Sequence, residues 1–583
     1  MSKKISLTIV LAILTGFVLS AQINTGIQYF QLGHYKEAKQ CFAKEQNTNS
    51  AELNFYLGEL AFAEGDIQKA EEYYNKGLSI NPASIYNQIG LRKLKIRSDE
   101  KGADAFFKTI KKNYKKDASV MLAIGRAYLD NGMYKKANEG VSDAKKINSK
   151  LPEIYILEGD ILISEDRKMK SGEAAGKYEM SIHFDPNYAL GYVKMAQIYE
   201  VISPATAIEK LKTVIEKKPD FTIAYAYLGK VYTHNGYYSL AINMYQTYFE
   251  AGIYTIEDIE RYARANFFSD NFDKAEKLAE EGLSREPNHF VLNRYLMYIY
   301  SKTKDVLSGT EIAGKFFTLR EPSGYIAEDY MRYAIILKEA ILFNDAVAQF
   351  EKAISLDPDK FELYTEAASS AREMRNYGLA SGFQRRLIER KAELVDANAD
   401  EVVDINTLGT DYYSAGATAN RSLQTKTFQP MEPLMADKKT TDMLLAADKS
   451  LISDSLTLNV EYFTREYASY YLNKADSVFT LLIERVPEGY SVYRFKALTQ
   501  NALYPDIKDG AAKTYYEKVA EILEEKNDPD TYRRLLIEAY NYISYHYYQT
   551  DDIPNTIIYC NKVLELDPEN NNARLILEDV TNK

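Results

Sequence analysis

The side chains best suited to metal binding or nucleophilic catalysis are few and scattered in this chain. No two of the five histidines lie three to five residues apart, and none of them pairs with Cys41 or Cys560. Zinc sites and similar centres need histidine and cysteine ligands at such short spacings. We therefore expect no metal site and no cofactor. The histidines are His34, His183, His234, His289 and His546.

One glycine-rich stretch, Gly172 to Tyr178, partly matches a phosphate-binding loop. It is one residue too short, and Tyr178 stands where that loop needs serine or threonine. It also lies on a predicted helix with no strand before it. The chain has no nucleophile elbow and no dinucleotide-binding glycine pattern. The sequence therefore predicts that the protein is not an enzyme.

The stretch from Ala51 to Pro82 shows what kind of element carries these residues. Small residues such as Gly58 and Ala70 recur with helical spacing on either side of the break at Gly65 and Asp66. Side chains this small let two helices approach closely, while Leu57 and Tyr74 fill the surrounding space. The pattern predicts a helical hairpin whose apolar face must be covered by further copies of itself.

The copies are present along most of the chain. Tyr225 to Tyr248 repeats the same spacing of glycine, alanine and tyrosine, and the closing proline recurs at Pro186, Pro219 and Pro287. Pro186 and Pro219 lie 33 residues apart, and Pro219 and Pro287 lie 68 apart. A period of about 34 residues with helix–turn–helix chemistry is typical of tetratricopeptide repeats. From roughly residue 22 to its end, the chain resembles the tetratricopeptide-repeat (TPR) family, and its carboxyl end resembles exported TPR proteins of Bacteroidota-type bacteria.

The resemblance implies an all-α, right-handed solenoid of stacked hairpins. In that family the first helix of each hairpin lines a concave groove, and the residue after the small glycine faces into it. The resemblance therefore implies a groove containing six residues of interest, four of them basic. Such a set would hold an acidic peptide or a terminal carboxylate. The six are Arg126, Lys230, Arg264, Arg294, Phe267 and Tyr298.

Two other interpretations of these residues stay open. The favoured interpretation of the basic side chains themselves is that they are ordinary surface charges that neutralise neighbouring glutamates. The 49 tyrosines, mostly at helix-packing positions, also allow a carbohydrate-binding accessory protein that stacks sugars on tyrosine, although tryptophan is absent. The set of basic residues with which some TPR proteins bind chaperone tails is incomplete, so that role is not carried over.

Chain length, net charge and the two cysteines limit the folds and partners that are possible. The chain has 583 residues, too many for one ordinary globular core, but a solenoid grows without that limit. The net charge of −11 argues against general binding of nucleic acid. Cys41 and Cys560 would lie in the first and last repeats, too far apart for a disulfide.

The amino-terminal residues predict export. Lys3 and Lys4 precede an apolar run from Ile5 to Leu19, and small residues follow at Ser20 and Ala21. The run is shorter than the roughly 20 residues that a spanning helix needs, so residues 1–21 are expected to be a cleaved signal peptide. An uncleaved anchor is the alternative. We expect a periplasmic or outer-membrane-associated protein with no membrane span after cleavage.

Spacing also predicts an insertion. After a TPR solenoid over residues 22–392, residues 393–460 form a divergent repeat, and residues 461–583 form carboxyl-terminal repeats with a capping helix. Residues 414–441 show no helical apolar period and contain two prolines, so we expect an inserted loop there. An enzyme site within that loop is a third hypothesis that no motif supports.

The most favoured function is a non-enzymatic scaffold of the cell envelope. It would bind peptides or proteins of an envelope assembly in the concave groove. The sequence does not predict which partner binds or the oligomeric state.

Overall fold

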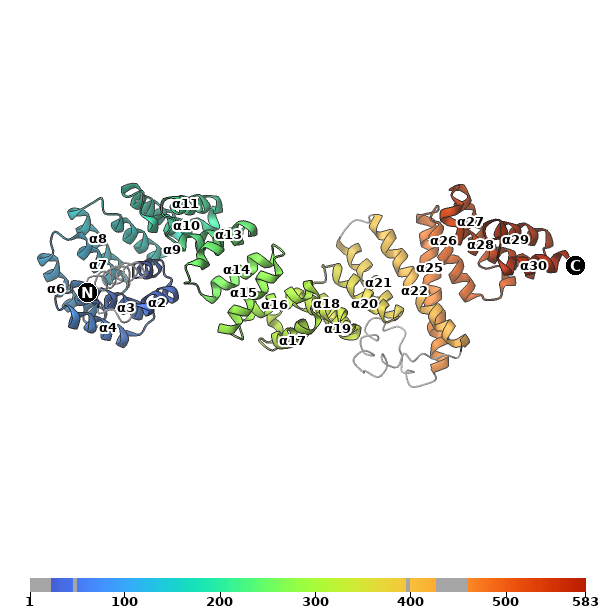
Figure 1. The fold of residues 1–583 in the computed structure, drawn as a ribbon, viewed down its shortest axis with the longest axis horizontal. Helices are drawn as coiled ribbons and strands as arrows, with labels where there is room; N and C mark the ends of the chain where they lie inside the picture. The colour runs from blue at the N-terminus through green and yellow to red at the C-terminus, as the bar shows by residue number, and fades with distance from the viewer. Residues whose placement is uncertain (1–22, 46–49, 395–398, 426–459, 583) are drawn as a thin grey trace, which may run out of the picture. The chain divides into compact units, whose positions relative to one another are not determined.

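The computed structural model describes residues 23–45, 50–394, 399–425 and 460–582, and the part of the chain that it describes contains helices and no strand (Figure 1). The all-α solenoid of helical hairpins predicted from the repeats is confirmed. The predicted signal peptide, residues 1–21, lies outside the described residues. Among those described, no helix is both long enough and apolar enough to cross a bilayer.

Each hairpin begins and ends where local chemistry requires it, as the pair α3 (Ala51–Ala63) and α4 (Ile67–Ile80) shows. The Ser50 hydroxyl accepts a hydrogen bond from the Leu53 amide, which satisfies a free donor at the start of α3. Gly65 has φ of +85°, a conformation that side chains disfavour, and it turns the chain. Asp66 then caps α4 by accepting from the Lys69 amide.

Glycines and one buried tyrosine join this hairpin to the next. The ring of Tyr74 is fully buried, and it lies against both Gly58 of α3 and Gly90 of α5 (Ile85–Lys93). A Cβ atom at either glycine would overlap the ring. The hydroxyl of Tyr74 donates to the Glu59 carboxylate over 2.6 Å, so the buried polar atom is satisfied.

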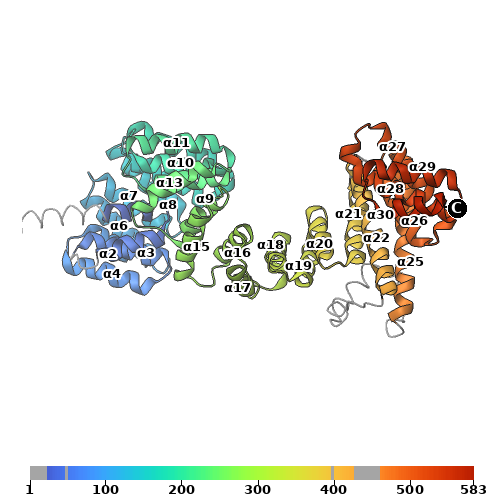
Figure 2. The same ribbon diagram turned by 45° about the vertical axis from the view of Figure 1, so that its right-hand side comes forward.

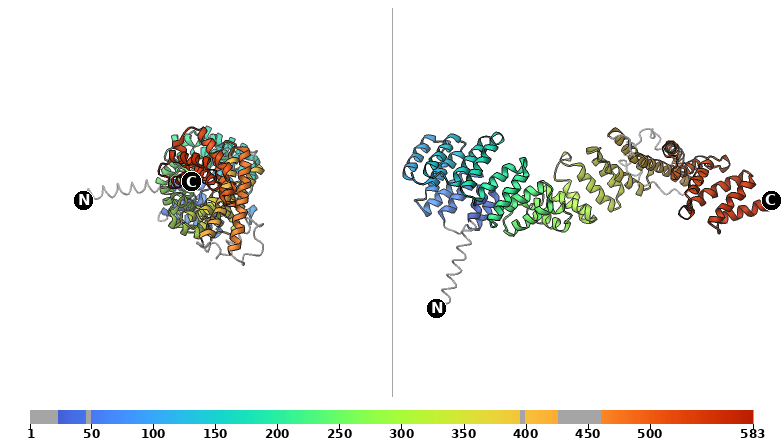
Figure 3. Two further views of the ribbon diagram at one scale, coloured as in Figure 1. Left: turned by 90° about the vertical axis from the view of Figure 1, so that its right-hand side faces the viewer. Right: turned by 90° about the horizontal axis from the view of Figure 1, so that it is seen from above.

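The chain divides into two compact units, one ending at Ile299 and the other starting at Tyr300. In unit 1 the hairpins follow one another in chain order (Figure 3). Its helices, after the helical residues 23–31, are α2 (Tyr35–Lys44), α3, α4, α5, α6 (Glu100–Asn113), α7 (Ala118–Leu129), α8 (Tyr134–Ile147), α9 (Pro152–Phe184), α10 (Ala189–Ile202), α11 (Pro204–Lys217), α12 (Ile223–His234), α13 (Tyr238–Glu250), α14 (Ile256–Phe267), α15 (Phe272–Arg285) and most of α16 (Phe290–Thr303).

Within unit 1 the first helices of the hairpins form a chain of neighbours. Helix α3 packs on α5, α5 on α7, α7 on α9, α9 on α10 and α10 on α12. Helix α9 is itself a hairpin, because the backbone at Asp166 leaves the helical conformation and separates its two halves. The first hairpin, residues 23–44, packs on α3 at one side and also contacts α12, α13 and α14. The hairpins of unit 1 therefore close into a ring.

Unit 2 continues with α17 (Val306–Phe316) and ends with α30 (Asn571–Thr581), whose start is capped by Asn570. Cys560 is buried and free, as is Cys41 in unit 1. The helices between α17 and α30 are α18 (Ala327–Glu339), α19 (Phe343–Leu356), α20 (Glu362–Glu373), α21 (Tyr377–Leu394), α22 (Ala399–Thr425), α25 (Val460–Arg485), α26 (Tyr490–Leu503), α27 (Lys513–Glu525), α28 (Pro529–Gln549) and α29 (Ile553–Leu566), with short 3₁₀ turns at Pro322–Gly324 and Ile507–Asp509.

The structure corrects the start of the predicted loop at residues 414–441. Residues 414–425 belong to α22, which pairs with α25 along its length (Figure 2). Ala415 and Ala419 are buried, and Gly416 lies so close to Leu472 and the Ala468 carbonyl of α25 that a Cβ atom would collide with both. The stretch is helical because its small residues allow this close approach. Residues 426–441 lie outside the described part of the chain.

Candidate partner-binding cavity

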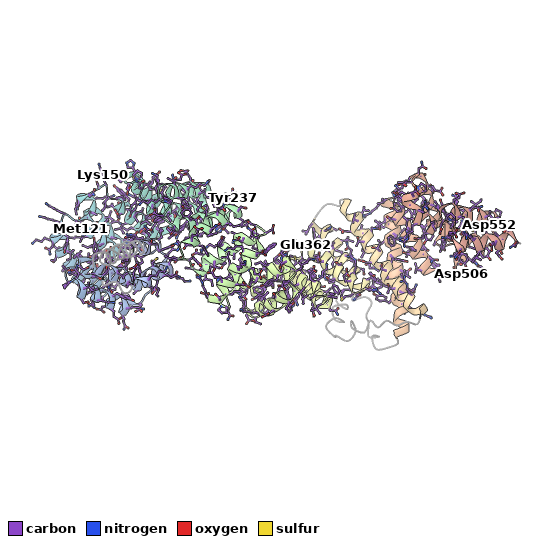
Figure 4. All side chains as sticks on the ribbon, in the orientation of Figure 1. Met121, Lys150, Tyr237, Glu362, Asp506 and Asp552 are labelled. Atoms are coloured by element: carbon purple, nitrogen blue, oxygen red, sulfur yellow. The ribbon has the colours of Figure 1, made fainter. Side chains whose placement is uncertain are left out.

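A cavity of about 1250 Å³ lies inside unit 1, bounded by the ring of first helices. The hairpins from the first to that of α12 contribute side chains from the helix that faces inward, and the first hairpin contributes Phe30 to Gly33 and Tyr35. Figure 4 labels Met121, a buried residue of the cavity-lining helix α7, and Tyr237, which lies at the turn between α12 and α13 and is not among the lining residues. The cavity therefore lies on the inner side of the ring, where the repeats predict a concave groove.

Aromatic side chains form one wall of the cavity. The ring of Phe55 lies 5.1 Å from Tyr56 and 5.7 Å from Tyr86, and Tyr56 lies 6.4 Å from Phe30, between ring centroids. Burial and neighbouring carboxylates raise the pKa of Tyr56 and Tyr86, so both stay neutral at physiological pH. This wall offers flat apolar surface with hydroxyl groups that donate and accept hydrogen bonds.

A ladder of ion pairs crosses the inner helices, and its first step is centred on Lys93 of α5. The Lys93 ammonium lies 2.7 Å from a Glu59 oxygen of α3 and 2.6 Å from an Asp130 oxygen beside α7. Burial alone would lower the pKa of Lys93, but the two carboxylates outweigh it and raise the pKa above its usual value. One buried cation thus joins three successive hairpins.

The second step of the ladder is centred on an anion, Asp160 of α9, instead of a cation. Its carboxylate lies 2.6 Å from the Arg126 guanidinium of α7 and 3.0 Å from the Lys194 ammonium of α10, and it accepts a hydrogen bond from Tyr178. Burial would raise the pKa of Asp160, but Lys194 and Arg126 hold it below its usual range. Asp160 therefore stays ionised and links three neighbouring helices.

Lys230 of α12 forms the last step of the ladder with Glu200 of α10. Their charged atoms lie 2.9 Å apart, and Glu200 is also 3.7 Å from the imidazole of His234. Both predicted basic residues that line the cavity, Arg126 and Lys230, thus have an acidic partner on a neighbouring helix. Each is still more than a third exposed, at 39% and 36% of the side chain.

The other four predicted groove residues lie elsewhere. Arg264 and Phe267 of α14, like Arg294 and Tyr298 of α16, are not among the residues that line the cavity. Phe267 and Tyr298 are buried with their rings 6.2 Å apart. These four residues therefore lie outside this cavity, and two of them, Phe267 and Tyr298, pack between α14 and α16.

The two predicted cations outside the cavity stack on aromatic rings instead. The guanidinium of Arg264 lies 5.8 Å from the Phe268 ring, and that of Arg294 lies 4.6 Å from the Phe290 ring. Such contacts hold a long cationic side chain against its own helix. Neither arginine is placed to meet a ligand in the cavity.

Sequence reasoning missed the partners that complete the ladder. Lys93 follows Glu59 by 34 residues, and Asp160 follows Arg126 by the same distance, as Lys194 follows Asp160. A separation of one repeat places two residues at equivalent positions on neighbouring hairpins. Opposite charges one repeat apart were therefore the signal that would have predicted the ion pairs.

No group of histidine, cysteine or acidic side chains in the described ranges is arranged to hold a metal ion. The arrangement in the cavity is suited to binding through aromatic contact and hydrogen bonds.

The comparisons with known proteins agree with the repeat architecture. The family model "Tetratricopeptide repeat" matches residues 51–84, which is the hairpin of α3 and α4. A search of curated proteins finds no match to this chain. Resemblance to tetratricopeptide-repeat proteins is thus supported by the family model.

Three solved structures are similar to parts of this chain. The C-terminal part of a TPR repeat-containing protein from Cytophaga hutchinsonii is 20% identical and covers 55% of this chain and 99% of its own, with a TM-score of 0.36. A tetratricopeptide repeat protein from Parabacteroides merdae is 18% identical and covers 43% and 98%, with a TM-score of 0.29. Yeast Tom70 is 14% identical and covers 71% and 100%, with a TM-score of 0.26.

Proposed function

We propose that this protein is a non-enzymatic interaction scaffold that binds a peptide segment of a partner protein in the cavity of unit 1. The cavity carries the proposal. Its volume of about 1250 Å³ exceeds the roughly 300–1,000 Å³ typical of small-molecule pockets. A site of this size, lined by side chains from six or more helices, suits a chain segment better than a metabolite.

The chemistry of the lining indicates how a peptide would bind. The Arg126–Asp160 and Lys230–Glu200 pairs already satisfy the charges of the two predicted basic residues. The aromatic wall of Phe55, Tyr56 and Tyr86 keeps part of its ring surface exposed to the cavity. We therefore expect apolar and aromatic side chains of the peptide to supply most of the affinity, because buried aromatic contacts dominate protein interfaces.

The cellular setting of this function rests on the sequence. The basic start at Lys3 and Lys4, the apolar run from Ile5 to Leu19 and the small residues at Ser20 and Ala21 support export to the periplasm or the outer membrane. The partner would then be a protein of an envelope assembly. Amino-terminal sequencing of the protein from its own cells should find a start near Gln22, and recovery of intact Met1 in the cytoplasm would contradict export.

A photo-crosslinking pair tests the binding site. A benzophenone amino acid replaces Tyr86, a half-exposed tyrosine that lines the cavity, or Tyr237, an exposed tyrosine outside it. In an envelope extract, the probe at position 86 should crosslink to one linear segment of a partner, identified by mass spectrometry, while the probe at 237 should give no specific product. The same segment made as a synthetic peptide should bind the purified protein.

Substitution of the same two tyrosines by alanine tests whether the peptide loses affinity. Tyr86→Ala should weaken that peptide's binding by about tenfold, since truncating a central aromatic anchor commonly costs more than 1 kcal/mol. Tyr237→Ala should leave it unchanged. Equal crosslinking at both positions, or none at position 86, would refute the cavity as the binding site.

A further inference from the structure

The first hairpin of unit 1, residues 23–44, is held on two sides by contacts of different chemistry. On the side of α3 the contacts are aromatic: the ring of Tyr56 lies 6.4 Å from Phe30 and 6.2 Å from Phe42. Phe42 is fully buried. We refer to this side as the aromatic seam. Separating it would expose large apolar rings to water, which is unfavourable.

On the other side the first hairpin meets α12, α13 and α14 through polar groups that are carried largely on aromatic rings. The imidazole Nε2 of His34 lies 2.7 Å from the Tyr227 hydroxyl, and the Lys36 ammonium lies 2.6 Å from Glu257. The Tyr29 hydroxyl donates to the Tyr248 hydroxyl over a long 3.5 Å. These contacts, the polar seam, join residues 193 to 221 positions apart and close the ring.

The polar contacts of this seam are each weak. Lys36 and Glu257 are exposed by 67% and 43%, and ion pairs in water contribute little. Hydrogen bonds broken there are replaced by hydrogen bonds to water, so their net loss is small.

The polar seam is also part of the cavity wall. Tyr227, which bonds His34, lines the cavity together with Gln197, whose side-chain amide donates to the same hydroxyl. Phe30, Leu32 and Tyr35 of the first hairpin line it as well. Opening this seam would therefore open the side of the cavity without disturbing the ion-pair ladder.

We propose that the first hairpin is a gate: the polar seam opens while the aromatic seam holds, and a partner segment enters the cavity sideways through the gap. Lateral entry would let a segment in the middle of a partner chain reach the inside of the ring without threading an end through it. The entry of a partner rests on the function proposed above, but the opening of the polar seam does not.

Spin-label distances measure the opening without any partner. Gln40 of α2 and Glu250 at the end of α13 are both exposed, and each is replaced by cysteine and labelled. Cys41 and Cys560 are fully buried, and burial raises the pKa of the Cys41 thiol to about 11, so neither competes for the label. The parent protein should show one main distance, from the closed ring, and a minor longer one.

Charge reversal should then change the relative populations of the shorter and the longer distance. Lys36→Glu places a second carboxylate against Glu257 and should increase the longer-distance population by about three- to tenfold, the range expected for losing a surface ion pair and adding a repulsion. Lys36→Glu with Glu257→Lys restores opposite charges and should return the population to that of the parent. Tyr227→Phe, which removes the hydroxyl shared by His34 and Gln197, should also increase it. Circular dichroism should show the same helicity in all variants.

Two outcomes overturn the gate. One is a distance distribution that stays the same in every variant, and the other is an increase that Glu257→Lys does not reverse. A second arm tests entry: the peptide identified by crosslinking at position 86 should associate faster with Lys36→Glu than with the parent. If the distances shift and the association rate does not, lateral entry is refuted while the binding site stands. Absence of any crosslink at position 86 would instead refute the proposed function and leave the distance result intact.

Discussion

Asp160→Asn is expected to destabilise unit 1 by about 2–4 kcal/mol, because it leaves two cations without their shared counter-charge. Asparagine has nearly the same shape as aspartate and still accepts a hydrogen bond from Tyr178, so packing is preserved. The Arg126 guanidinium and the Lys194 ammonium, 2.6 and 3.0 Å from the carboxylate, would then repel each other in a poorly solvated place. The midpoint of urea unfolding, followed by helical circular dichroism, measures the loss.

Asp143→Asn is the matched control. The Asp143 carboxylate also binds two cations, Lys111 at 2.8 Å and Lys146 at 2.9 Å, but 30% of its side chain is exposed against 11% for Asp160. Water compensates for a lost partner at an exposed site, so we expect a loss of about 1 kcal/mol or less. Equal effects of the two substitutions would show that Asp160 is not the centre of a buried network.

The effect of Asp160→Asn should also depend on pH in a defined direction. Lys194 and Arg126 hold the pKa of Asp160 below its usual range in the folded protein despite burial. A carboxyl group with a lowered folded pKa stabilises the fold above its unfolded pKa, which is about 4, and loses that contribution as the pH falls toward the folded value. The stability difference between the parent and Asp160→Asn should therefore be full at neutral pH and shrink below pH about 4.

The repeat spacing predicted the hairpins well, because each hairpin depends on residues close to one another in the chain. Gly58 allows helix approach, Gly65 provides the left-handed turn and Asp66 caps the next helix, and all three lie within one repeat. Each of these signals is local and acts wherever the same residue stands at the same position. The hairpin pattern therefore followed from one copy and extended to the others.

Residues 414–425 were misassigned for a physical reason. An apolar period detects large side chains at helical spacing, whereas this helix packs through Ala415, Gly416 and Ala419, whose contribution is the absence of bulk. Close contact between small residues buries backbone and neighbouring side chains, such as Leu472, without producing a periodic apolar signal. Small-residue stretches between helices therefore need to be considered as helix interfaces before they are assigned to loops.

The cavity was only partly predictable. Equivalent repeat positions placed Arg126 and Lys230 on the inner surface, as expected for a solenoid. Closure of the ring at Tyr29 and Tyr248 depends on the small rotation between each hairpin and the next, added over six or more hairpins. No residue spacing within one repeat determines that total rotation. The position of Arg264 relative to the cavity depends on the same total rotation, so its place outside the cavity could not be predicted from one repeat.

Gly140→Ala is expected to destabilise unit 1, whereas the same substitution at Gly176 is expected to stabilise it. Gly140 of α8 crosses Gly125 of α7 so closely that an added Cβ atom would lie 2.7 Å from the Gly125 Cα and 3.0 Å from the Met121 carbonyl oxygen. Both obstacles are backbone atoms, so no side chain can turn away and the two helices must separate. Overpacking of this kind costs about 1–3 kcal/mol.

Gly176 supplies the control because it is also helical but exposed, with no atom within 4 Å of an added Cβ. Alanine there restricts the unfolded chain and favours the helix, a gain of about 0.5–1 kcal/mol. The same gain applies at Gly140, so the difference between the two variants isolates the collision with α7. Urea unfolding should move the midpoint down for Gly140→Ala and up for Gly176→Ala, and hydrogen exchange should become faster in α7 and α8 only in the first. Stabilisation by both substitutions would mean that α7 and α8 do not cross at these two glycines.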